Sequence, residues 1–396
     1  MPVTQDYWIN KVNSPTNELS RSQSIPLQMN KKGKKGKKGW RKIQIQKQEE
    51  KPQKKPRVFI LYTGGTLGMK HDDKGTLTPD PNFLEELLQK MPAFSDPIVP
   101  TLVLNHVEPI IDSSDMNTRN WISIAKVIAQ VYDSFDGFVI IHGTDTMAYT
   151  ASALSFLLEN LGKPVILTGS QIPLCVIRSD AQSNLIDSLL VAGYSKIPEV
   201  MVVFDRLILR GNRTRKINSW NVEAFHSDNF PQLGECGIKI TFNKRLIRRT
   251  PSKPFKIYDK MQKKVVLLKI FPGAKHLAKA VLADPKIKGV VIEAYGSGNV
   301  PSDPGLIRVI SQATKRGVIA VVTSQCQMGK VDLGQYSAGA QLIEVGCLPG
   351  LDLTSEAAFT KLCFLLGQDL TLNQVRQFLL TNLRGELTPP LKHIGY

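Results

Sequence analysis

The sequence predicts an α/β protein of two domains, each built on a mainly parallel sheet. Short apolar runs alternate with segments whose apolar residues recur every three or four positions, which is the pattern of buried parallel strands joined by helices. The alternation stops in a polar stretch near residues 243–262 and then begins again. A length of 396 residues is enough for two domains that each bury a core.

Four apolar runs in the first half have the length of a buried strand. They are VFIL (58–61), GFVII (137–141), PVILT (164–168) and EVMVVF (199–204). The segments WISIAKVIAQVYDSF (121–135) and AYTASALSFLLENLG (148–162) repeat apolar residues at helical spacing and predict helices. We expect this larger N-terminal domain, with a mainly parallel sheet, to span residues 57–250.

The same alternation returns after a polar segment, residues 251–262, that we interpret as a linker. Strands are predicted at VVLLKIF (265–271), GVVIEAY (289–295) and VIAVVTS (318–324), and helices at 274–284, 303–317, 354–367 and 372–385. These elements predict a smaller, flavodoxin-like α/β domain over residues 263–396.

Positive charge is concentrated at the N-terminus. The chain carries 51 Lys and Arg against 34 Asp and Glu, a net charge of +17, and residues 1–57 account for +11 of it. Residues 1–56 are rich in Lys, Gln, Asn and Ser and lack a sustained apolar period, so we predict a disordered, Lys-rich tail. The basic charge balance therefore describes the tail and does not predict a nucleic-acid-binding body.

Composition excludes several classes of protein. The N-terminus lacks the apolar core of a secretory signal, and no run of about 18 apolar residues predicts a membrane span. Five scattered cysteines without a CxxC pair, and histidines without metal-ligand spacing, predict neither a disulfide framework nor a metal site. We expect a cytoplasmic protein with no metal, no cofactor and no membrane contact.

Small polar residues follow four of the predicted strands. The segments are Thr63–Thr66, His142–Asp145, Thr168–Ser170 and Gly296–Asn299. Ligands of open α/β sheets bind at the carboxyl ends of the strands, so these segments are candidates for a site. Thr66 follows two glycines, where a sharp turn can present its hydroxyl as a nucleophile, although a Gly-rich turn with a capping Thr has the same sequence.

A second candidate set follows in HGTDT, where Thr144 and Asp145 leave one strand together. A hydroxyl needs a base to become a nucleophile, and a Thr–Asp–Lys chain can relay the proton. Lys216 in RGNRTRK is the lysine best placed for this role. Burial or a neighbouring charge would have to shift it toward its neutral form, and a solvated lysine beside three arginines is the alternative.

Four motifs in order resemble those of the bacterial-type L-asparaginases, specifically the intracellular type I branch. They are LYTGGTLG (61–68), IIDSSDM (110–116), GFVIIHGTDTMAYT (137–150) and RGNRTRK (210–216). The resemblance spans roughly residues 57–388 and includes YGSGNVP (295–301) and LDLTSEAA (351–358) in the second domain. GxxxxHGTDT is the most specific of these motifs.

The resemblance implies hydrolysis of L-asparagine to L-aspartate and ammonia, with Thr66 as the nucleophile that forms an acyl-enzyme. It makes Thr144, Asp145 and Lys216 the set that activates the nucleophile or a water. The substrate-binding residues that it implies are Asp112, Ser113, Ser114, Thr144, Asp145 and, from a neighbouring subunit, Asn299. The family is usually a homotetramer built from dimers, so we expect a homo-oligomer, either a dimer or a tetramer.

One departure from the family bears on catalysis. Many members carry a tyrosine ten residues after the nucleophile, where this sequence has Thr76. The tyrosine of the family's Thr–Tyr–Lys arrangement is therefore missing from its usual place. Tyr336, in GQYSAG of the second domain, is a candidate catalytic replacement if it reaches a site across a subunit boundary; a packed surface tyrosine is the alternative.

Two other functions remain open from the sequence. An ammonia-releasing amidotransferase-type subunit for tRNA-dependent amidation shares this fold, and the basic tail would attract phosphate backbones. Alternatively, the departure at Thr76 marks a weakened enzyme whose Lys-rich residues 31–57 contact RNA or a ribosome. Retention of all four catalytic positions favours an active enzyme over that interpretation. A glutaminase side activity is left open, because one methylene is worth only about 1–3 kcal/mol in discrimination.

Overall fold

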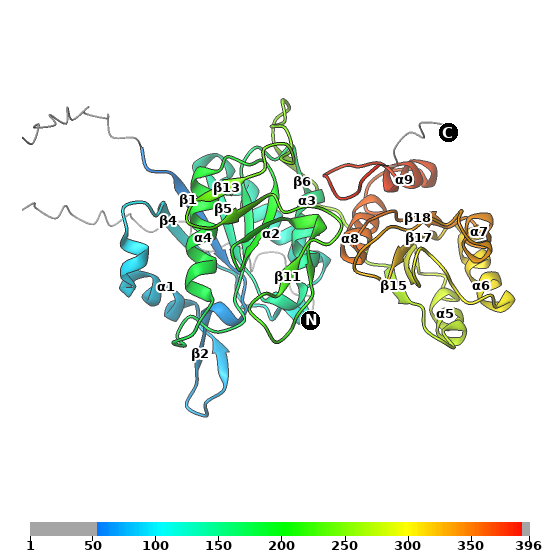
Figure 1. Cartoon of the computed structure of the whole chain (residues 1–396), viewed down its shortest axis with the longest axis horizontal. Coiled ribbons are helices and arrows are strands. Elements are labelled where there is room, and N and C mark those ends of the chain that lie inside the picture. Colours follow the sequence, from blue (N-terminus) through cyan, green and yellow to red (C-terminus); the bar gives the residue numbers. More distant parts are fainter. Residues whose placement is uncertain (1–53, 390–396) are drawn as a thin grey trace, which may run out of the picture. The chain divides into compact units, whose positions relative to one another are not determined.

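The computed structural model describes residues 54–389, so the predicted tail at 1–56 lies almost entirely outside the described residues. The described part contains an eight-stranded sheet from the first part of the chain and a four-stranded sheet from the last part (Figure 1). The α/β class with a larger and a smaller parallel-rich sheet is confirmed. The domain boundaries at residues 250 and 263 stay a prediction.

The larger sheet has the strand order β13-β12-β9-β8-β7-β5-β1-β4. The five strands from β8 to β4 are parallel, whereas β9, β12 and β13 are joined by antiparallel pairing. The bounds are β1 (Arg57–Tyr62), β4 (Thr101–His106), β5 (Gly137–Ile141), β7 (Val165–Thr168), β8 (Val200–Phe204), β9 (Leu207–Arg210), β12 (Gly234–Cys236) and β13 (Ile240–Phe242).

All four strands predicted for this domain are present, and the parallel strand β4 and the antiparallel edge are additions to the prediction. β9 follows β8 through Asp205 and Arg206, which both have positive φ, as in the two-residue type I′ turns of hairpins. Asp and Arg are not the Asn-Gly pair that marks such a turn in a sequence, so the hairpin carried no clear signal.

Helices cover both faces of the larger sheet. Ile60 and Val139 share a core with Leu185 of α4 (Ala181–Tyr194). Their neighbours along the strands point to the opposite face, where Tyr132, directly after α2 (Thr118–Val131), stacks on Phe138 with ring centroids 5.8 Å apart. α1 (Pro81–Lys90) adds Leu84 to the first core.

The helix α3 (Met147–Leu157) is apolar on nearly all sides because it lies between the larger sheet and the second domain. Every residue from Thr150 to Leu157 is buried. Phe156 stacks on Phe364 of α8 (Ser355–Leu365), with ring centroids 5.8 Å apart. The helix ends before the predicted residue 162, because β6 (Leu158–Glu159) pairs with β14 (Lys256–Ile257) of the predicted linker.

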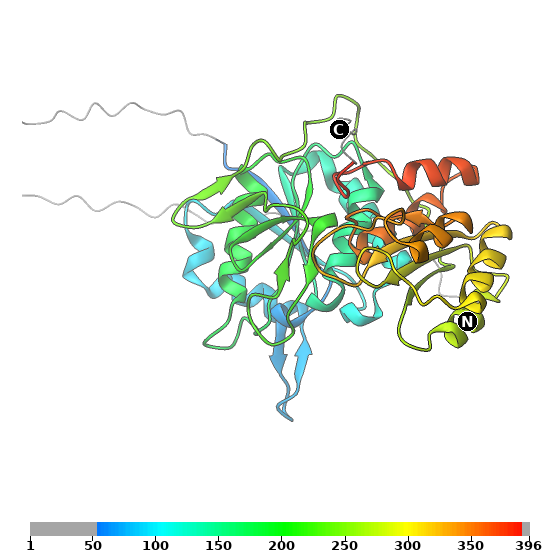
Figure 2. The ribbon, with the colours of Figure 1, turned by 45° about the vertical axis from the view of Figure 1, so that its right-hand side comes forward.

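The smaller sheet runs in chain order, β15-β16-β17-β18, with all strands parallel. A flavodoxin sheet, in contrast, places its first two strands in reverse order. The bounds are β15 (Val265–Lys269), β16 (Gly289–Ala294), β17 (Ile319–Ser324), β18 (Leu348–Pro349), α5 (Lys275–Leu282), α6 (Pro304–Lys315), α7 (Ser337–Glu344) and α9 (Leu372–Leu379). α5, α6 and α7 share one core with the sheet, and α8 contacts β15, β16 and β17 (Figure 2).

The segment after α9 is attached by buried charges. The side chains of Lys361 on α8 and of Glu386 are both fully buried, and Nζ of Lys361 lies 2.5 Å from Oε1 of Glu386. The Lys361 ammonium also donates to the carbonyls of Leu379 and Thr381, and the Glu386 carboxylate accepts from the backbone N–H groups of Leu383 and Arg384. Burial alone would raise the pKa of Glu386, but the ammonium and these hydrogen bonds hold it below its ordinary value.

Breaking this pair from either side should destabilise the protein. Lys361→Met or Glu386→Gln leaves one partner buried without its counter-charge, which typically costs about 3–5 kcal/mol. We expect each to lower the urea midpoint strongly and the double variant to recover part of the loss. The matched control is Lys260→Met, which removes an exposed pair with Asp369 and should cost less than about 1 kcal/mol. Equal effects of Lys361→Met and Lys260→Met would contradict this account.

Candidate active site

Three short 3₁₀ turns begin at the carboxyl ends of neighbouring parallel strands and carry most of the predicted site residues. Thr66–Gly68 follows β1, Ser113–Asp115 follows β4, and Thr144–Thr146 follows β5. Because β4, β1 and β5 are adjacent in the sheet, the three turns lie side by side. The structure thus brings Thr66, Ser113 and Ser114, and Thr144 and Asp145 to one edge of the sheet.

The turns touch one another through glycine backbones. A Cβ added to Gly65 would lie 2.5 Å from the backbone nitrogen of Gly143, and a Cβ on Gly143 would lie 2.5 Å from Oγ of Ser113. Gly65 also has a φ of +97°, which disfavours any side chain. The Thr146 hydroxyl donates to the Ser113 carbonyl at 2.6 Å and joins the last two turns. The Gly-rich motifs are therefore explained by close packing of the loops around Thr66.

Lys216 reaches the second predicted set from a distant part of the chain. It lies in β10 (Arg215–Lys216), which pairs with β11 (Phe225–His226). Its ammonium donates to Oγ1 of Thr144 at 2.8 Å and to Oδ1 of Asp145 at 2.7 Å. The Lys216 and Thr144 side chains are largely buried, whereas the Asp145 side chain is 67% exposed. The lysine is thus held by the predicted partners, and Asp145 is open to a ligand.

The three residues predicted to cradle a substrate form one capped turn. The Asp112 carboxylate accepts from both the backbone N–H and the hydroxyl of Ser114, each at 2.9 Å. Ser113 is buried, and Asp112 and Ser114 are exposed. Asp112 therefore orients Ser114, and Ser114 is the more direct candidate for contact with a ligand.

A buried chain of hydrogen bonds lies beneath HGTDT. The Trp121 indole donates to the Thr150 hydroxyl at 3.0 Å, and that hydroxyl lies 2.9 Å from Nε2 of His142. Nδ1 of His142 lies 2.7 Å from the Gly143 carbonyl. Burial lowers the pKa of His142 to about 4, so the imidazole is neutral near pH 7. His142 is thus a neutral group beneath the turn that carries Thr144.

Gln171 is a site residue that sequence reasoning missed. Its Oε1 accepts from the Thr144 hydroxyl at 3.3 Å, and its Nε2 donates to the carbonyl of Asn221. The Asp180 carboxylate accepts the backbone N–H groups of Gln171 and Ile172 and fixes this loop after β7. Gln171 directly follows the polar segment Thr168–Ser170 at the end of a predicted strand, and this position is the one feature of the sequence that points to it.

Three predicted positions are not joined to this cluster within the described part of the chain. Thr76 is in the connection between β2 (Met69–His71) and β3 (Leu77–Pro79), where its backbone N–H donates to Asp72. Tyr336 is 52% exposed at the start of α7, and Asn299 pairs with Tyr295 after β16. Among residues 54–389, no hydrogen bond links Tyr336 or Asn299 to Thr66, Thr144 or Lys216.

Family models assign the two halves of the chain. "Asparaginase, N-terminal" matches residues 57–248, and "Glutaminase/Asparaginase C-terminal domain" matches residues 264–379. The chain belongs to the asparaginase family. The resemblance drawn from the sequence motifs is thereby confirmed.

Individual members of the family agree with this assignment. L-asparaginase 1 of Escherichia coli K12 is 42% identical over 341 residues, which cover 85% of this chain and 99% of the relative. The structure of L-asparaginase I from Vibrio cholerae superimposes with a TM-score of 0.77 at 42% identity and covers 84% and 99% of the two chains. A glutamyl-tRNA(Gln) amidotransferase subunit from Pyrococcus abyssi is 38% identical over 84% of this chain and 77% of its own.

The described residues add two findings on membranes and metals. Among residues 54–389, no helix combines the length and apolarity needed to cross a bilayer. In the same range, no three His, Cys, Asp or Glu side chains are grouped to hold a metal ion. All five cysteines are free thiols in the structure.

The stability of the folded chain should depend on pH through His142. A folded-state pKa of about 4, below the ordinary value of 6.5, means that stability is fully present above pH 6.5 and is lost as pH falls toward 4. Between pH 7 and pH 5 we expect His142 to contribute a loss of about 2 kcal/mol. His142→Gln should remove that part of the slope in urea titrations at both pH values. An unchanged slope would show that His142 is not a buried neutral group.

Proposed function

We propose that this chain hydrolyses L-asparagine to L-aspartate and ammonia through a Thr66 acyl-enzyme. The hydrogen-bonded set of Lys216, Thr144 and Asp145, packed against the turn that presents Thr66, carries the proposal. Membership of the asparaginase family and the similarity to L-asparaginase 1 of Escherichia coli support asparagine as the substrate.

In the first proposed step, the Thr66 hydroxyl attacks the side-chain amide carbon of asparagine. The C–N bond then breaks, and the nitrogen leaves as ammonia with the proton that the hydroxyl lost. Water attacks the resulting ester, aspartate departs and one water proton returns to Thr66. Backbone N–H groups near Gly65 and Thr144 are candidates to stabilise the oxyanion.

Lys216 and Thr144 are proposed to move the proton. In the described arrangement the ammonium of Lys216 donates to Thr144, so it must lose a proton before it can accept one. Asp145 is the proposed partner of the substrate ammonium, because its carboxylate is exposed beside the cluster. Ser113 and Ser114 are proposed to bind the α-carboxylate from the neighbouring turn.

A homo-oligomer, either a dimer or a tetramer, would complete this site. We propose that Tyr336 and Asn299 of one copy reach the site of another, with Tyr336 replacing the tyrosine missing at Thr76. The exposure of Tyr336 and its lack of a hydrogen bond to the cluster in its own chain, within the described range, support this proposal. Because the two residues lie in the second domain, the catalytic unit would then include parts of two chains.

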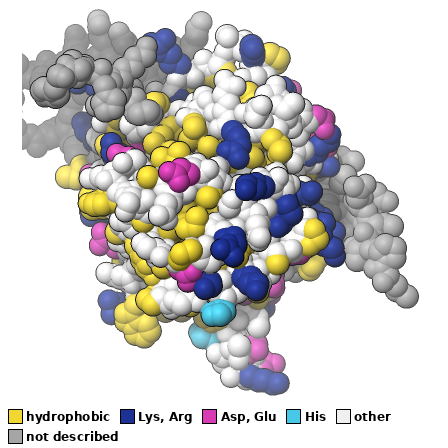
Figure 3. Space-filling model, turned by 90° about the vertical axis from the view of Figure 1, so that its right-hand side faces the viewer, with side chains coloured by type: hydrophobic (Ala, Val, Ile, Leu, Met, Phe, Trp, Pro, Cys, Tyr) yellow, Lys and Arg dark blue, Asp and Glu magenta, His cyan; other side chains and the backbone are white. Residues whose placement is uncertain are grey.

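The amidotransferase-type alternative is less well supported. The match to the amidotransferase relative of Pyrococcus abyssi takes in 77% of that protein, whereas the match to the Escherichia coli L-asparaginase 1 takes in 99%. Nucleic-acid contact through residues 31–57 stays a prediction from the KKGKKGKK run. Figure 3 shows further Lys and Arg side chains on the face of the second domain. A cytoplasmic location likewise rests on the sequence.

Substitution of the proposed nucleophile should abolish ammonia release. We expect Thr66→Ala to lower kcat on the order of 10⁴-fold and Lys216→Met to lower it by about 10²- to 10⁴-fold, with L-asparagine as substrate. The matched control is Thr101→Ala, because Thr101 is exposed at the amino end of β4, away from the turns. Thermal unfolding of each variant should be measured as a check that it folds. Full activity of Thr66→Ala would overturn the proposed mechanism, and ammonia release from L-glutamine reports the side activity.

A hybrid assembly should reveal whether sites are shared between copies. Thr66→Ala and Tyr336→Phe chains, mixed by co-expression, should recover about a quarter of wild-type activity if a site takes Thr66 from one copy and Tyr336 from its symmetric partner. A mixture of Thr66→Ala and Lys216→Met should recover none, because both residues belong to the same chain's cluster. Recovery in neither mixture, or full activity of Tyr336→Phe alone, contradicts the role of Tyr336.

A further inference from the structure

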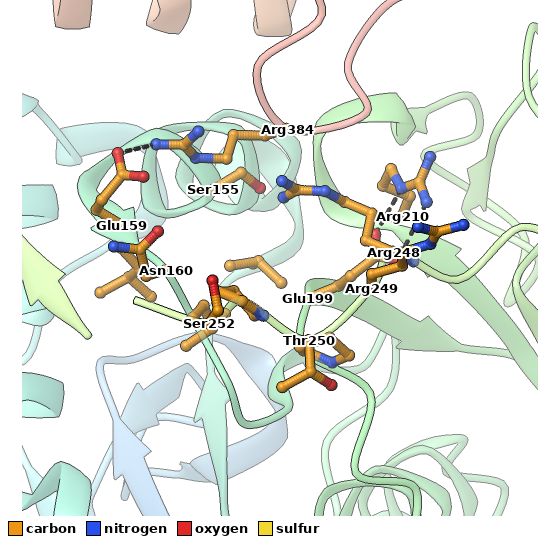
Figure 4. Close-up of a pocket in the computed structure, with 15 residues that line it drawn as sticks. Ser155, Glu159, Asn160, Glu199, Arg210, Arg248, Arg249, Thr250, Ser252 and Arg384 are labelled. Atoms are coloured by element: carbon orange, nitrogen blue, oxygen red, sulfur yellow. Dashed lines mark hydrogen bonds and ion pairs between the residues drawn. The ribbon is translucent and has the colours of Figure 1, made fainter. Parts of the chain in front are cut away.

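A cavity of about 330 Å³ lies at the end of α3 farthest from Thr144 (Figure 4). α3 has 11 residues, so the two sites are separated by about 16 Å along the helix. The cavity also meets β8 at its first residue, Val200, whereas the catalytic turns follow the last residues of their strands. It is therefore a different site, at the opposite edge of the larger sheet.

Guanidinium groups outnumber carboxylates in the wall of this cavity. Arg384 and Glu159 lie on one side of the opening, and Glu199 and Arg210 lie on the other, with Ser252 below (Figure 4). The arginines that line the cavity are Arg210, Arg248, Arg249 and Arg384, and the carboxylates are Glu159 and Glu199. The wall thus carries an excess of two positive charges at neutral pH.

The two carboxylates are already engaged. Glu199 is buried and accepts two hydrogen bonds from Arg210, at 2.6 and 3.1 Å, together with the backbone N–H of Arg248. Glu159 pairs with one terminal nitrogen of Arg384. The charges of Arg210 and Arg384 are therefore balanced by protein groups, and those of Arg248 and Arg249 form the excess.

Arg248 is the cation that most clearly lacks a partner of opposite charge. Within residues 54–389, no carboxylate lies at ion-pair distance from it, and its guanidinium donates to the Leu383 carbonyl at 3.3 Å. Burial lowers the pKa of Arg248, and the neighbouring guanidinium group of Arg384 lowers it further, whereas the carboxylates of Glu199 and Glu386 act in the opposite direction. Nε of Arg384 is also buried without an acceptor in the same range. Crowded cations with unused donors are stabilised when an anion is bound between them.

We propose that this cavity binds a small dianion whose carboxylate or phosphate oxygens are held by Arg248, with Arg384 and Arg249 as further donors. The volume is that of a small-molecule site. Guanidinium forks bind such planar or tetrahedral oxyanions with two parallel hydrogen bonds. Asn160, Thr250 and Ser252 supply neutral polar groups at the wall. The site does not depend on the proposed catalytic function, because binding is measured without turnover.

Calorimetric titration of the full chain with sodium phosphate and, separately, with sodium succinate tests this proposal. Chloride keeps the ionic strength constant, so general screening does not change during the titration. We expect saturable binding of at least one of the two anions at one site per chain. Binding of phosphate alone identifies a phosphate-type ligand. Binding of succinate alone identifies a dicarboxylate ligand of the cavity when the wall substitutions below weaken it, because succinate also resembles the aspartate of the proposed active site. Binding of neither overturns the proposal.

Substitutions at the wall locate the bound anion. Arg248→Gln should weaken binding by about tenfold or more, because it removes a charge-assisted hydrogen bond. Ser252 is exposed, so Ser252→Glu should weaken binding to a similar extent by repulsion, whereas the size-matched Ser252→Gln should not. The basic control is Lys253→Gln, which lies beside the cavity but does not line it. If Arg248→Gln does not fold, the comparison of Ser252→Glu with Ser252→Gln still tests whether the anion binds in the cavity. Equal binding by these two variants overturns the proposal.

Discussion

The site depends on direct backbone contact between the turns that follow β1 and β5. Gly65 and Gly143 leave no room for a side chain at that contact, and Ser113 lies against Gly143 from the third turn. Adjacent parallel strands end at the same edge of the sheet, so the sheet brings the turns into register before any side chain interacts. A hydroxyl at Thr66 and a hydroxyl at Thr144 thus belong to one rigid backbone arrangement.

Hydrogen bonds and packing from neighbouring elements hold these turns in place. Trp121 and Thr150 hold His142 beneath the turn of Thr144, and Asp180 holds the loop of Gln171 beside it. α3 begins directly after the Thr144 turn and is enclosed between the larger sheet and α8. Movement of the turn would therefore disturb the packing of α3 against α8 of the second domain.

Much of this organisation is predictable from the sequence, for identifiable reasons. Buried parallel strands are nearly continuous apolar runs, so β1, β5, β7 and β8 stood out, as did the polar segments after them. Lys216 came from chemical reasoning and family resemblance, since it reaches Thr144 across 72 residues of sequence. Gln171 was missed because a single amide after a strand has no distinctive spacing. The arginine-lined cavity could not be predicted either, because its wall is assembled from five separate segments of the chain.

The buried pair of Lys361 and Glu386 has a consequence for synthesis on the ribosome. A growing chain emerges from its N-terminus, so α8 appears before the segment that carries Glu386. Until that segment is synthesised, the ammonium of Lys361 lacks the carboxylate of Glu386 as its partner. The cost of burying the unpaired ammonium then opposes the packing of α8 against α3. Packing of α8 is thus linked to synthesis of the segment that carries Glu386, and a chain terminated before that segment would expose apolar helices to chaperones and proteases.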